Sequence, residues 1–365
     1  MSVTRQLSNG QMLTDWTEEV NDIANQYGMF NGSGLFTGKG TSQTSIVFDK
    51  TTNQIVLLSQ TRRNAGAPTK GVDRKVETFS LALPYFLHQD YITPQDIQGL
   101  RKPGTPDGAE SLANVIADKL EDMRLTADQT REFMKIQAIK GQTSDADGNT
   151  IADMFDELGL TVGDYEIDFD LGNAAADIDG TIAQLKRSVA KEARTGGRVG
   201  KIEVACSPEF FDALVSHPKI REAYLHYQVT NNNSDAVRGD LAMFETWGVV
   251  DRFEHKGILF YSYDAEFNID DGDGTTSIIR GIGSGAGYRD TGTKEGFTVV
   301  RGMRNLYNGV FGPANTLSGA NQVGSEIMTY QYTDPKDKFH EMELEMANLY
   351  YMSRPQVSWR VFSST

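Results

Sequence analysis

The feature that most constrains the fold is a helical pattern that runs from Asp107 to Gly141. Its apolar residues recur at spacings of three and four, the period of one helix face, at Leu112, Val115, Ile116, Leu120, Met123, Phe133, Ile136 and Ile139. Pro106 and Asp107 are typical of a helix start, and Gly141 of a helix end. At about 1.5 Å per residue, this pattern predicts a rod about 50 Å long, whereas the average globular helix has about 11 to 12 residues.

The apolar stripe of this helix is interrupted around Leu125. Because the spacing does not keep a strict heptad through 126–130, a coiled-coil strand is the less favoured interpretation. A single long helix with one apolar stripe needs other elements packed along it. We therefore expect an α+β fold in which the rest of the chain supplies them.

Composition limits the possible classes of protein. The chain has 365 residues, 39% of them hydrophobic, which is enough for one sizeable core or two smaller ones. A net charge of −15 argues against nucleic-acid binding by the bulk surface. Cys206 is the single cysteine, so we expect neither an intramolecular disulfide nor a thiolate metal cluster. No apolar run is long enough for a membrane span, and we expect no secretion signal.

The first 92 residues predict two extended parts. Residues 1–40 have little core signal beyond one short amphipathic helix near Trp16, and the glycine-rich stretch 28–44 is typical of a flexible segment. Residues 41–92 predict a β-ribbon with strands at 46–48, 55–58 and 76–83 and a turn at 49–54. An isolated ribbon is marginally stable in water, so this one either folds back or lies on another chain.

The tip of the ribbon is the one cationic cluster in an acidic chain. Glycines and a proline lie among its five basic residues, which are Arg62, Arg63, Lys70, Arg74 and Lys75. A solvated loop is the simplest interpretation. We favour docking onto an acidic neighbour, because the ribbon has no evident core of its own.

After the long helix, the sequence alternates helices and strands. It predicts a helix at Ile178–Ala193, a buried strand at Ile202–Cys206, and a helix at 208–215 that Ser207 caps. The glycine- and asparagine-rich stretch 228–330 is interpreted as a separate α+β lobe with short strands. The last stretch predicts two strands, at 342–346 and 357–361, which pair and pack against the long helix.

The acidic loops are weak candidates for metal sites. Residues 145–149 resemble the start of a calcium loop, but glycine is missing from the sixth position and Asp156 stands where a glutamate is expected. A hairpin turn is therefore favoured there, and a solvated turn is favoured at 270–274. Cys206 is expected to be an inert core residue. No set of residues assembles an active site, and we expect neither an enzyme nor a bound cofactor.

The order of these parts resembles the major capsid proteins of tailed phages, specifically the lambda-type family with the Hong Kong 97-like fold. The similarity lies in the succession of several segments rather than in one motif. These segments are Ser45–Asp49 with Val56–Gln60 and Arg62-Arg63, then Glu77–Pro84, Tyr91–Ile97, Ala138–Gly141 with Asp145–Asn149, and Asp334–Phe339 with the strands up to Phe362.

The resemblance implies an architecture. Residues 1–40 would be an N-terminal arm, 41–92 an extended β-ribbon loop, and 107–141 a spine helix. The peripheral domain would comprise 93–227 and 330–365, and the axial domain 228–329. The basic ribbon tip would contact an adjacent subunit. In the closing segment, Asp334, Lys336 and Lys338 are further candidates for contacts between subunits.

The resemblance also implies a function and partners. Many copies would form hexamers and pentamers and assemble, in the host cytoplasm, into an icosahedral head that encloses double-stranded DNA without sequence-specific binding. A separate scaffolding protein and a portal protein would be partners, a decoration protein is a further candidate partner, and no membrane is expected. Two alternatives stay open: an encapsulin-type nanocompartment shell and a metal-dependent soluble enzyme.

Overall fold

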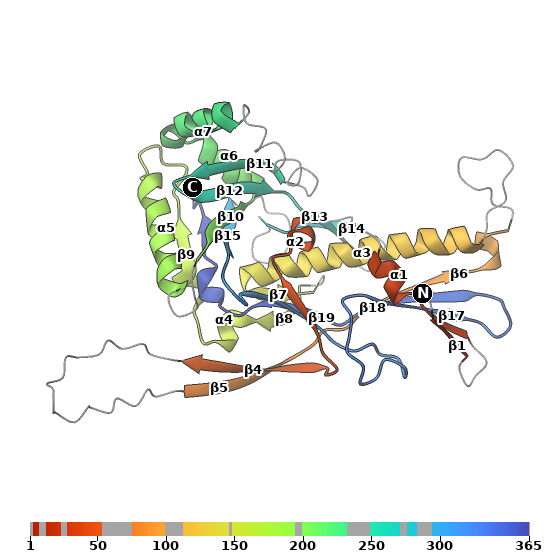
Figure 1. Cartoon of the computed structure of the whole chain (residues 1–365). Helices are drawn as coiled ribbons and strands as arrows, with labels where there is room; N and C mark the ends of the chain where they lie inside the picture. Colours follow the sequence, from red (N-terminus) through yellow and green to blue (C-terminus); the bar gives the residue numbers. More distant parts are fainter. Residues whose placement is uncertain are drawn as a thin grey trace, which may run out of the picture.

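The structure, a computed structural model, describes residues 3–6, 12–22, 28–52, 75–98, 112–145, 148–193, 199–231, 249–270, 276–282 and 294–364. Figure 1 shows an elongated molecule in which one long helix, α3 (Leu112–Lys140), joins two bodies. A sheet with three helices lies at one end of α3, and a second sheet lies along its other half. A two-stranded ribbon projects away from both.

Helix α3 confirms the predicted long helix, although residues 107–111 of the predicted range lie outside the described residues. The segment contains neither glycine nor proline, so nothing interrupts its hydrogen-bond ladder. The helix ends at Gly141, whose φ is +86°. A Cβ at Gly141 would lie 2.3 Å from the Phe155 ring, so both the conformation and the packing require glycine.

A five-stranded antiparallel sheet packs along the first half of α3. Its strand order is β1-β2-β17-β18-β6, and its strands are β1 (Val3–Gln6), β2 (Met12–Asp15), β17 (Met328–Thr333), β18 (His340–Met346) and β6 (Phe86–Ile92). Met342, Leu344 and Met346 of β18 share a core with Leu120 and Met123 of α3. Burying these apolar side chains removes them from water, and this holds sheet and helix together.

A six-stranded mixed sheet forms the other body, in the order β11-β12-β10-β15-β20-β9. Its strands are β11 (Val249–His255), β12 (Ile258–Tyr263), β10 (Lys201–Cys206), β15 (Glu295–Arg301), β20 (Arg360–Phe362) and β9 (Glu166–Asp168). Helices α5 (Ile178–Ala193), α6 (Pro208–Ser216) and α7 (Pro218–Asn231) belong to this body (Figure 1). The Ser207 hydroxyl caps α6 by accepting a hydrogen bond from the Phe210 N–H at 3.2 Å, as predicted.

This sheet corrects two sequence-based interpretations. The stretch 228–330 does not form a lobe of its own, because its strands β11, β12 and β15 join β10 and β20 in one sheet and one core. The two terminal strands do not pair with each other, since β18 and β20 belong to different sheets. Strand partners far apart in sequence leave no local signal, which is why periodicity alone misassigned them.

The ribbon consists of β4 (Ser45–Thr52) and β5 (Lys75–Ala82), paired antiparallel from Ser45 opposite Ala82 to Thr52 opposite Lys75. The turn predicted at 49–54 is therefore wrong, because β4 continues through Thr52. β-Branched residues such as Thr51 and Thr52 are compatible with a strand. The strand predicted at 55–58 lies outside the described residues. At its base the ribbon is anchored by Phe48, whose ring lies 4.7 Å from that of Tyr351.

The stretch expected to be flexible, 28–44, instead contains α2 (Met29–Gly32) and β3 (Thr37–Gly40). Met29 and Phe30 are buried, and β3 completes the sheet β19-β16-β3 with β16 (Tyr307–Phe311) and β19 (Asn348–Met352). The remaining elements are α1 (Thr17–Asp22), α4 (Met154–Glu157), the hairpins β7 (Gln142–Ser144) with β8 (Thr150–Asp153) and β13 (Glu266–Asp270) with β14 (Thr276–Arg280), and three short 3₁₀ turns at Pro94–Asp96, Val162–Tyr165 and Pro355–Val357.

Candidate intersubunit surfaces

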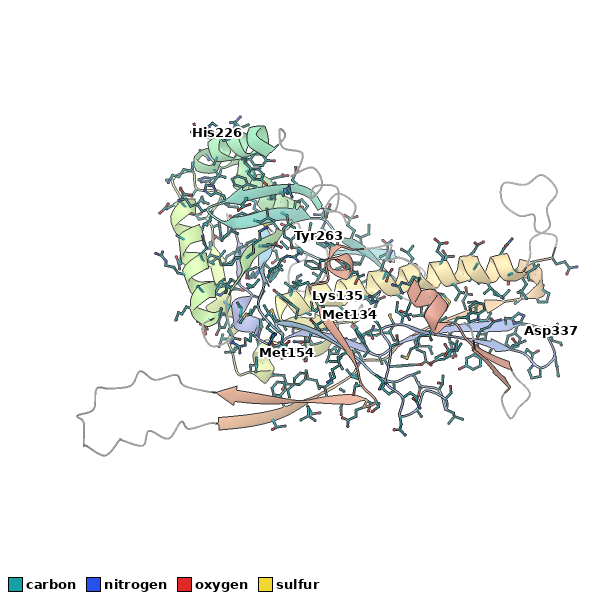
Figure 2. All side chains as sticks on the ribbon, viewed as in Figure 1. Met134, Lys135, Met154, His226, Tyr263 and Asp337 are labelled. Atoms are coloured by element: carbon teal, nitrogen blue, oxygen red, sulfur yellow. The ribbon has the colours of Figure 1, made fainter. Side chains whose placement is uncertain are left out.

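The predicted contact residues fall into two regions. Arg62, Arg63, Lys70 and Arg74 lie outside the described residues, and Lys75 is the first residue of β5, with its backbone opposite Thr52. Asp334, Lys336 and Lys338 lie together in the turn that connects β17 to β18. In Figure 2 the labelled Asp337 of this turn lies at the end of the molecule opposite the ribbon.

Asp334 shapes the β17–β18 turn. Its carboxylate accepts a hydrogen bond from the Lys338 N–H at 3.4 Å, and its carbonyl accepts one from the Asp337 N–H at 2.8 Å. Asp337 itself has a φ of +56°, a conformation that aspartate tolerates better than most residues. The turn therefore holds Lys336, Asp337 and Lys338 outward, and all three are exposed.

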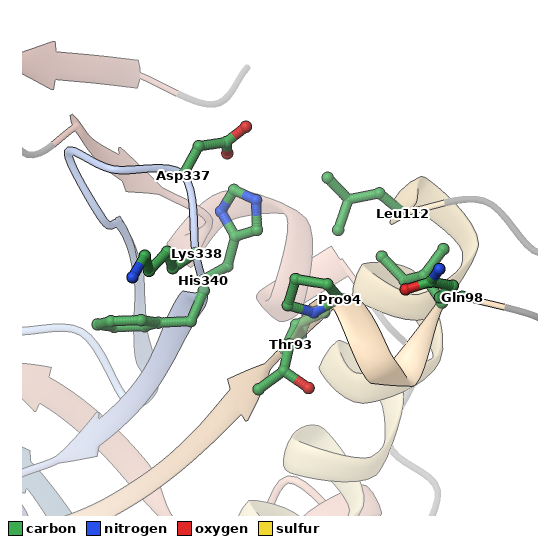
Figure 3. A pocket seen from close by; sticks show the side chains of 10 residues that line it. Thr93, Pro94, Gln98, Leu112, Asp337, Lys338 and His340 are labelled. Atoms are coloured by element: carbon green, nitrogen blue, oxygen red, sulfur yellow. The ribbon is translucent and has the colours of Figure 1, made fainter.

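A cavity of about 300 Å³ lies between this turn and the start of α3. Figure 3 shows Leu112 and Gln98 on one side, Asp337, Lys338 and His340 on the other, and Thr93 and Pro94 between them. Apolar side chains supply much of its wall: Ile92, Pro94, Ile97, Leu112 and Phe339.

The face of the five-stranded sheet turned away from α3 carries three glutamates in a row. Glu341, Glu343 and Glu345 alternate along β18 with the methionines and leucine that face the helix. On β6 their partners are Tyr91, Gln89 and Leu87, and on β17 they are Tyr332, Tyr330 and Met328. We call the three glutamates the glutamate row. The sequence analysis used only the apolar half of this alternation, although the acidic half was equally visible.

Hydrogen bonds fix the carboxylates of the glutamate row. Glu341 accepts from the Tyr91 hydroxyl at 2.9 Å, Glu343 from the Gln89 amide at 2.6 Å, and Glu345 from the Asn315 N–H at 2.8 Å. Glu345 is buried, whereas the β6 side of the face is open, with Leu87 46% and Tyr91 48% exposed.

Burial and the nearby carboxylates raise the pKa of two tyrosines around the glutamate row. Burial and the Glu345 carboxylate raise the pKa of Tyr85 to about 12. Burial and the charges of Asp15 and Glu345 raise the pKa of Tyr330 to about 12. Burial also raises the pKa of Glu345 itself. A phenolate would add negative charge beside carboxylates, so the tyrosines stay neutral hydrogen-bond donors to high pH.

The interruption in the apolar stripe of α3 is a buried polar junction. The Asp128 carboxylate lies between the guanidinium groups of Arg124, at 3.1 Å, and Arg131, at 2.5 Å. Arg131 also contacts Glu326 at 2.7 Å, and Tyr350 donates a hydrogen bond to the same carboxylate at 2.5 Å. Although burial alone raises the pKa of Glu326, the charges of Arg131 and Lys135 hold it below its usual value.

Glu132 joins three parts of the fold within this junction. Its carboxylate accepts hydrogen bonds from the Phe30 N–H at 2.9 Å, the Asn31 N–H at 2.7 Å and the Tyr263 hydroxyl at 2.5 Å. It therefore holds α2 and β12 on α3, and burial raises its pKa. Lys135 donates to the Asn31 side chain at 2.8 Å, and burial together with the Arg131 charge lowers its pKa to about 8. Figure 2 labels Lys135 and Tyr263 on either side of α2.

Sequence reasoning missed the junction because charged side chains on a helix usually face water. The available signal was the spacing: Arg124, Asp128, Arg131 and Lys135 follow one another at intervals of four, three and four residues. Such spacing places opposite charges together, but it does not distinguish a solvated face from a buried one.

The acidic loop that begins at Asp145 connects β7 to β8. The Asp145 carboxylate accepts hydrogen bonds from the Asn149 N–H at 2.7 Å and from its side-chain amide at 2.9 Å, and β7 and β8 flank it as a hairpin, as predicted. Residues 271–274 lie outside the described residues. Within the described ranges, no group of three or more His, Cys, Asp or Glu side chains is arranged to hold a metal ion. Cys206 is fully buried, and burial raises the pKa of its thiol.

No helix in the described part of the chain has both the length and the apolar character needed to span a membrane.

Two solved structures share this fold. A putative capsid protein of a prophage from E. coli CFT073 superposes with a TM-score of 0.54 at 14% identity, over 100% of both chains. The capsid protein of Ralstonia phage GP4 superposes with a TM-score of 0.53 at 9% identity, over 93% of this chain and 90% of that one. The chain therefore has the expected α+β capsid fold of the Hong Kong 97-like type.

Sequence relatives cover nearly the whole chain. The major capsid protein of Salmonella phage Felix O1 is 33% identical over 351 residues, which are 94% of each chain. The major capsid protein of Pseudomonas phage KPP10 is 30% identical over 362 residues, 96% of each. Residues 13–363 match the family described as phage major capsid protein E. The chain belongs to the phage major capsid protein E family.

Proposed function

We propose that this chain is the shell-forming subunit of a phage head, which many copies build around a double-stranded DNA genome. Family membership and the full-length similarity to two major capsid proteins support this function. The structural observation that carries it is the ribbon β4–β5, whose base packs on the body and whose far end projects away from it (Figure 1). A two-stranded ribbon is marginal by itself and gains stability when it lies on another subunit.

The arrangement of the sheets suggests a revised division of the subunit. Residues 1–40 are proposed as the arm and 41–92 as the ribbon loop, except that their strands β1, β2 and β6 are assigned to the peripheral domain, whose sheet they complete. The body containing the six-stranded sheet and α5–α7 is proposed as the axial domain, in place of 228–329 alone, since a boundary at residue 228 would divide that sheet. Helix α3 with the five-stranded sheet is proposed as the peripheral domain, which includes the β17–β18 turn.

Contacts between subunits are proposed at both ends of the molecule. Arg62, Arg63, Lys70, Arg74 and Lys75 would meet an acidic surface of a neighbour, because opposite charges steer and orient association. Asp334, Lys336 and Lys338 would meet neighbours at the other end, where they are held on a turn. We propose hexamers and pentamers as the assembly units, and a scaffolding protein, a portal protein and a decoration protein as partners.

The subunit is proposed to act without catalysing a reaction, to assemble in the host cytoplasm and to reside in the virion. The test is expression with and without a phage scaffolding protein, followed by light scattering and electron microscopy. Uniform hollow shells or capsomer-sized rings are expected. A stable monomer under both conditions would contradict the proposed function.

A further inference from the structure

The glutamate row gathers three carboxylates on one sheet face with no cation paired to them among the described residues. Within the polar junction, Asp128 and Glu326 have arginine or lysine partners within ion-pair distance. Glu341, Glu343 and Glu345 have hydrogen-bond donors instead, and no ion pair to them exists among the described residues. Successive side chains on one face of a strand lie about 7 Å apart, so the row concentrates negative charge within about 14 Å.

Like charges in a row cost free energy unless a cation balances them. The face also presents the rings of Tyr91 and Tyr332 on the two flanking strands. Carboxylates between aromatic rings suit arginine, whose planar guanidinium can donate paired hydrogen bonds to a carboxylate and stack on a ring. The ligand chemistry indicated by this surface is therefore an arginine-rich peptide.

The chain itself contains such a peptide. Between residues 53 and 75, Arg62, Arg63, Lys70, Arg74 and Lys75 are opposed only by Asp73, so this stretch carries five positive charges and one negative, a net +4 in a chain of net −15. In Figure 1, β4 and β5 run away from the five-stranded sheet of their own chain. The same figure shows the ribbon on the side of the sheet opposite α3, which is the side of the glutamate row. A second copy beside the first is thus better placed to supply the tip.

We propose that the glutamate row, with Glu341 and Glu343 as its accessible members, is the docking surface for the basic ribbon tip of a second copy of this chain. This inference rests on the proposed shell function and names the surfaces that would meet within it. Docking neutralises the row and covers the exposed Leu87 and Tyr91.

A charge-reversal experiment tests the pairing. The variant Glu341→Lys/Glu343→Lys and the variant Arg62→Glu/Arg63→Glu are each expected to lower particle yield at least tenfold, because every contact then places like charges together. The combination of all four substitutions is expected to restore particles to within about threefold of the original chain. Yield is measured by gradient sedimentation and electron microscopy.

Two controls separate the possible causes. Asp212→Lys/Glu254→Lys makes the same change in net charge at exposed sites on α6 and β11, and is expected to leave the yield unchanged. Denaturant unfolding of the unassembled Glu341→Lys/Glu343→Lys chain is expected to change little, because the hydrogen bonds that it removes, from Tyr91 and Gln89, are exposed and the docking contact is between copies. Normal yield from both reversal variants, absence of rescue by the combined variant, or loss of yield in the control would overturn the pairing. Shells from the unmodified chain would still support the proposed function.

Discussion

Replacing Glu132 with alanine should weaken the joint between α2, α3 and β12. The substitution removes the acceptor of three donors, of which the Phe30 N–H and the Tyr263 hydroxyl are buried and the Asn31 N–H is partly buried. Each unsatisfied buried donor costs about 1–3 kcal/mol and a partly exposed one less, which gives a sum on the order of 2–7 kcal/mol. Removing the carboxylate also removes the cost of burying its charge, so we expect a net loss of about 3–5 kcal/mol in the free energy of unfolding.

This loss is measurable in the unassembled chain. With an unfolding entropy of about 2.1 cal/mol/K per residue, a chain of 365 residues has a total of about 0.77 kcal/mol/K, so a loss of about 4 kcal/mol lowers Tm by about 5 °C. Denaturant unfolding gives the free energy, and hydrogen exchange of the Phe30 and Asn31 amides locates the change. Glu254→Ala, at an exposed position on β11, is the control and should change stability by less than about 0.5 kcal/mol.

A loss below about 1 kcal/mol for Glu132→Ala, or unchanged exchange of the Phe30 and Asn31 amides, would refute this reasoning. Either result would mean that apolar packing of Met29 and Phe30, rather than the carboxylate, holds α2 on the long helix.

Two further perturbations follow from single contacts. Ser207→Ala removes the hydroxyl that accepts from the Phe210 N–H, and should lower the free energy of unfolding by about 1 kcal/mol in denaturant titration, whereas Ser207→Asn should restore much of it. Tyr85→Phe should remove one phenol that titrates near pH 12, seen in the ultraviolet absorbance of tyrosinate. Because the pKa of Tyr85 in the folded chain is raised from 10.0, the stabilisation from its neutral form is present below pH 10 and is lost as the pH rises toward 12. If Tyr85→Phe instead removed a tyrosinate absorbance step near pH 10, the raised pKa would be contradicted.

The elements whose signals are local could be predicted from the residues alone. The three-and-four spacing of apolar residues defined α3, and the same period gave α5 its observed bounds, Ile178–Ala193. Ser207 followed by Pro208 marked the start of α6, and alternation at 76–83 marked β5. Side-chain periodicity and cap chemistry depend on residues within a few positions of one another, so they survive without tertiary context.

Which strands share a sheet, and which charged side chains are buried, depends on the tertiary structure. The strand β15 pairs with β10 and β20 across about 90 and 65 residues, and no local pattern records that choice. Glu132 is fully buried where α2 and β12 bring it three hydrogen-bond donors, and Arg131, which pairs with Asp128, is covered by Glu326 from outside the helix. The glutamate row exists as a surface because the register of β18 against β6 and β17 places its acids beside tyrosines. Pairing and register depend on the whole fold, since one residue of slip would exchange the buried and exposed faces of the strand.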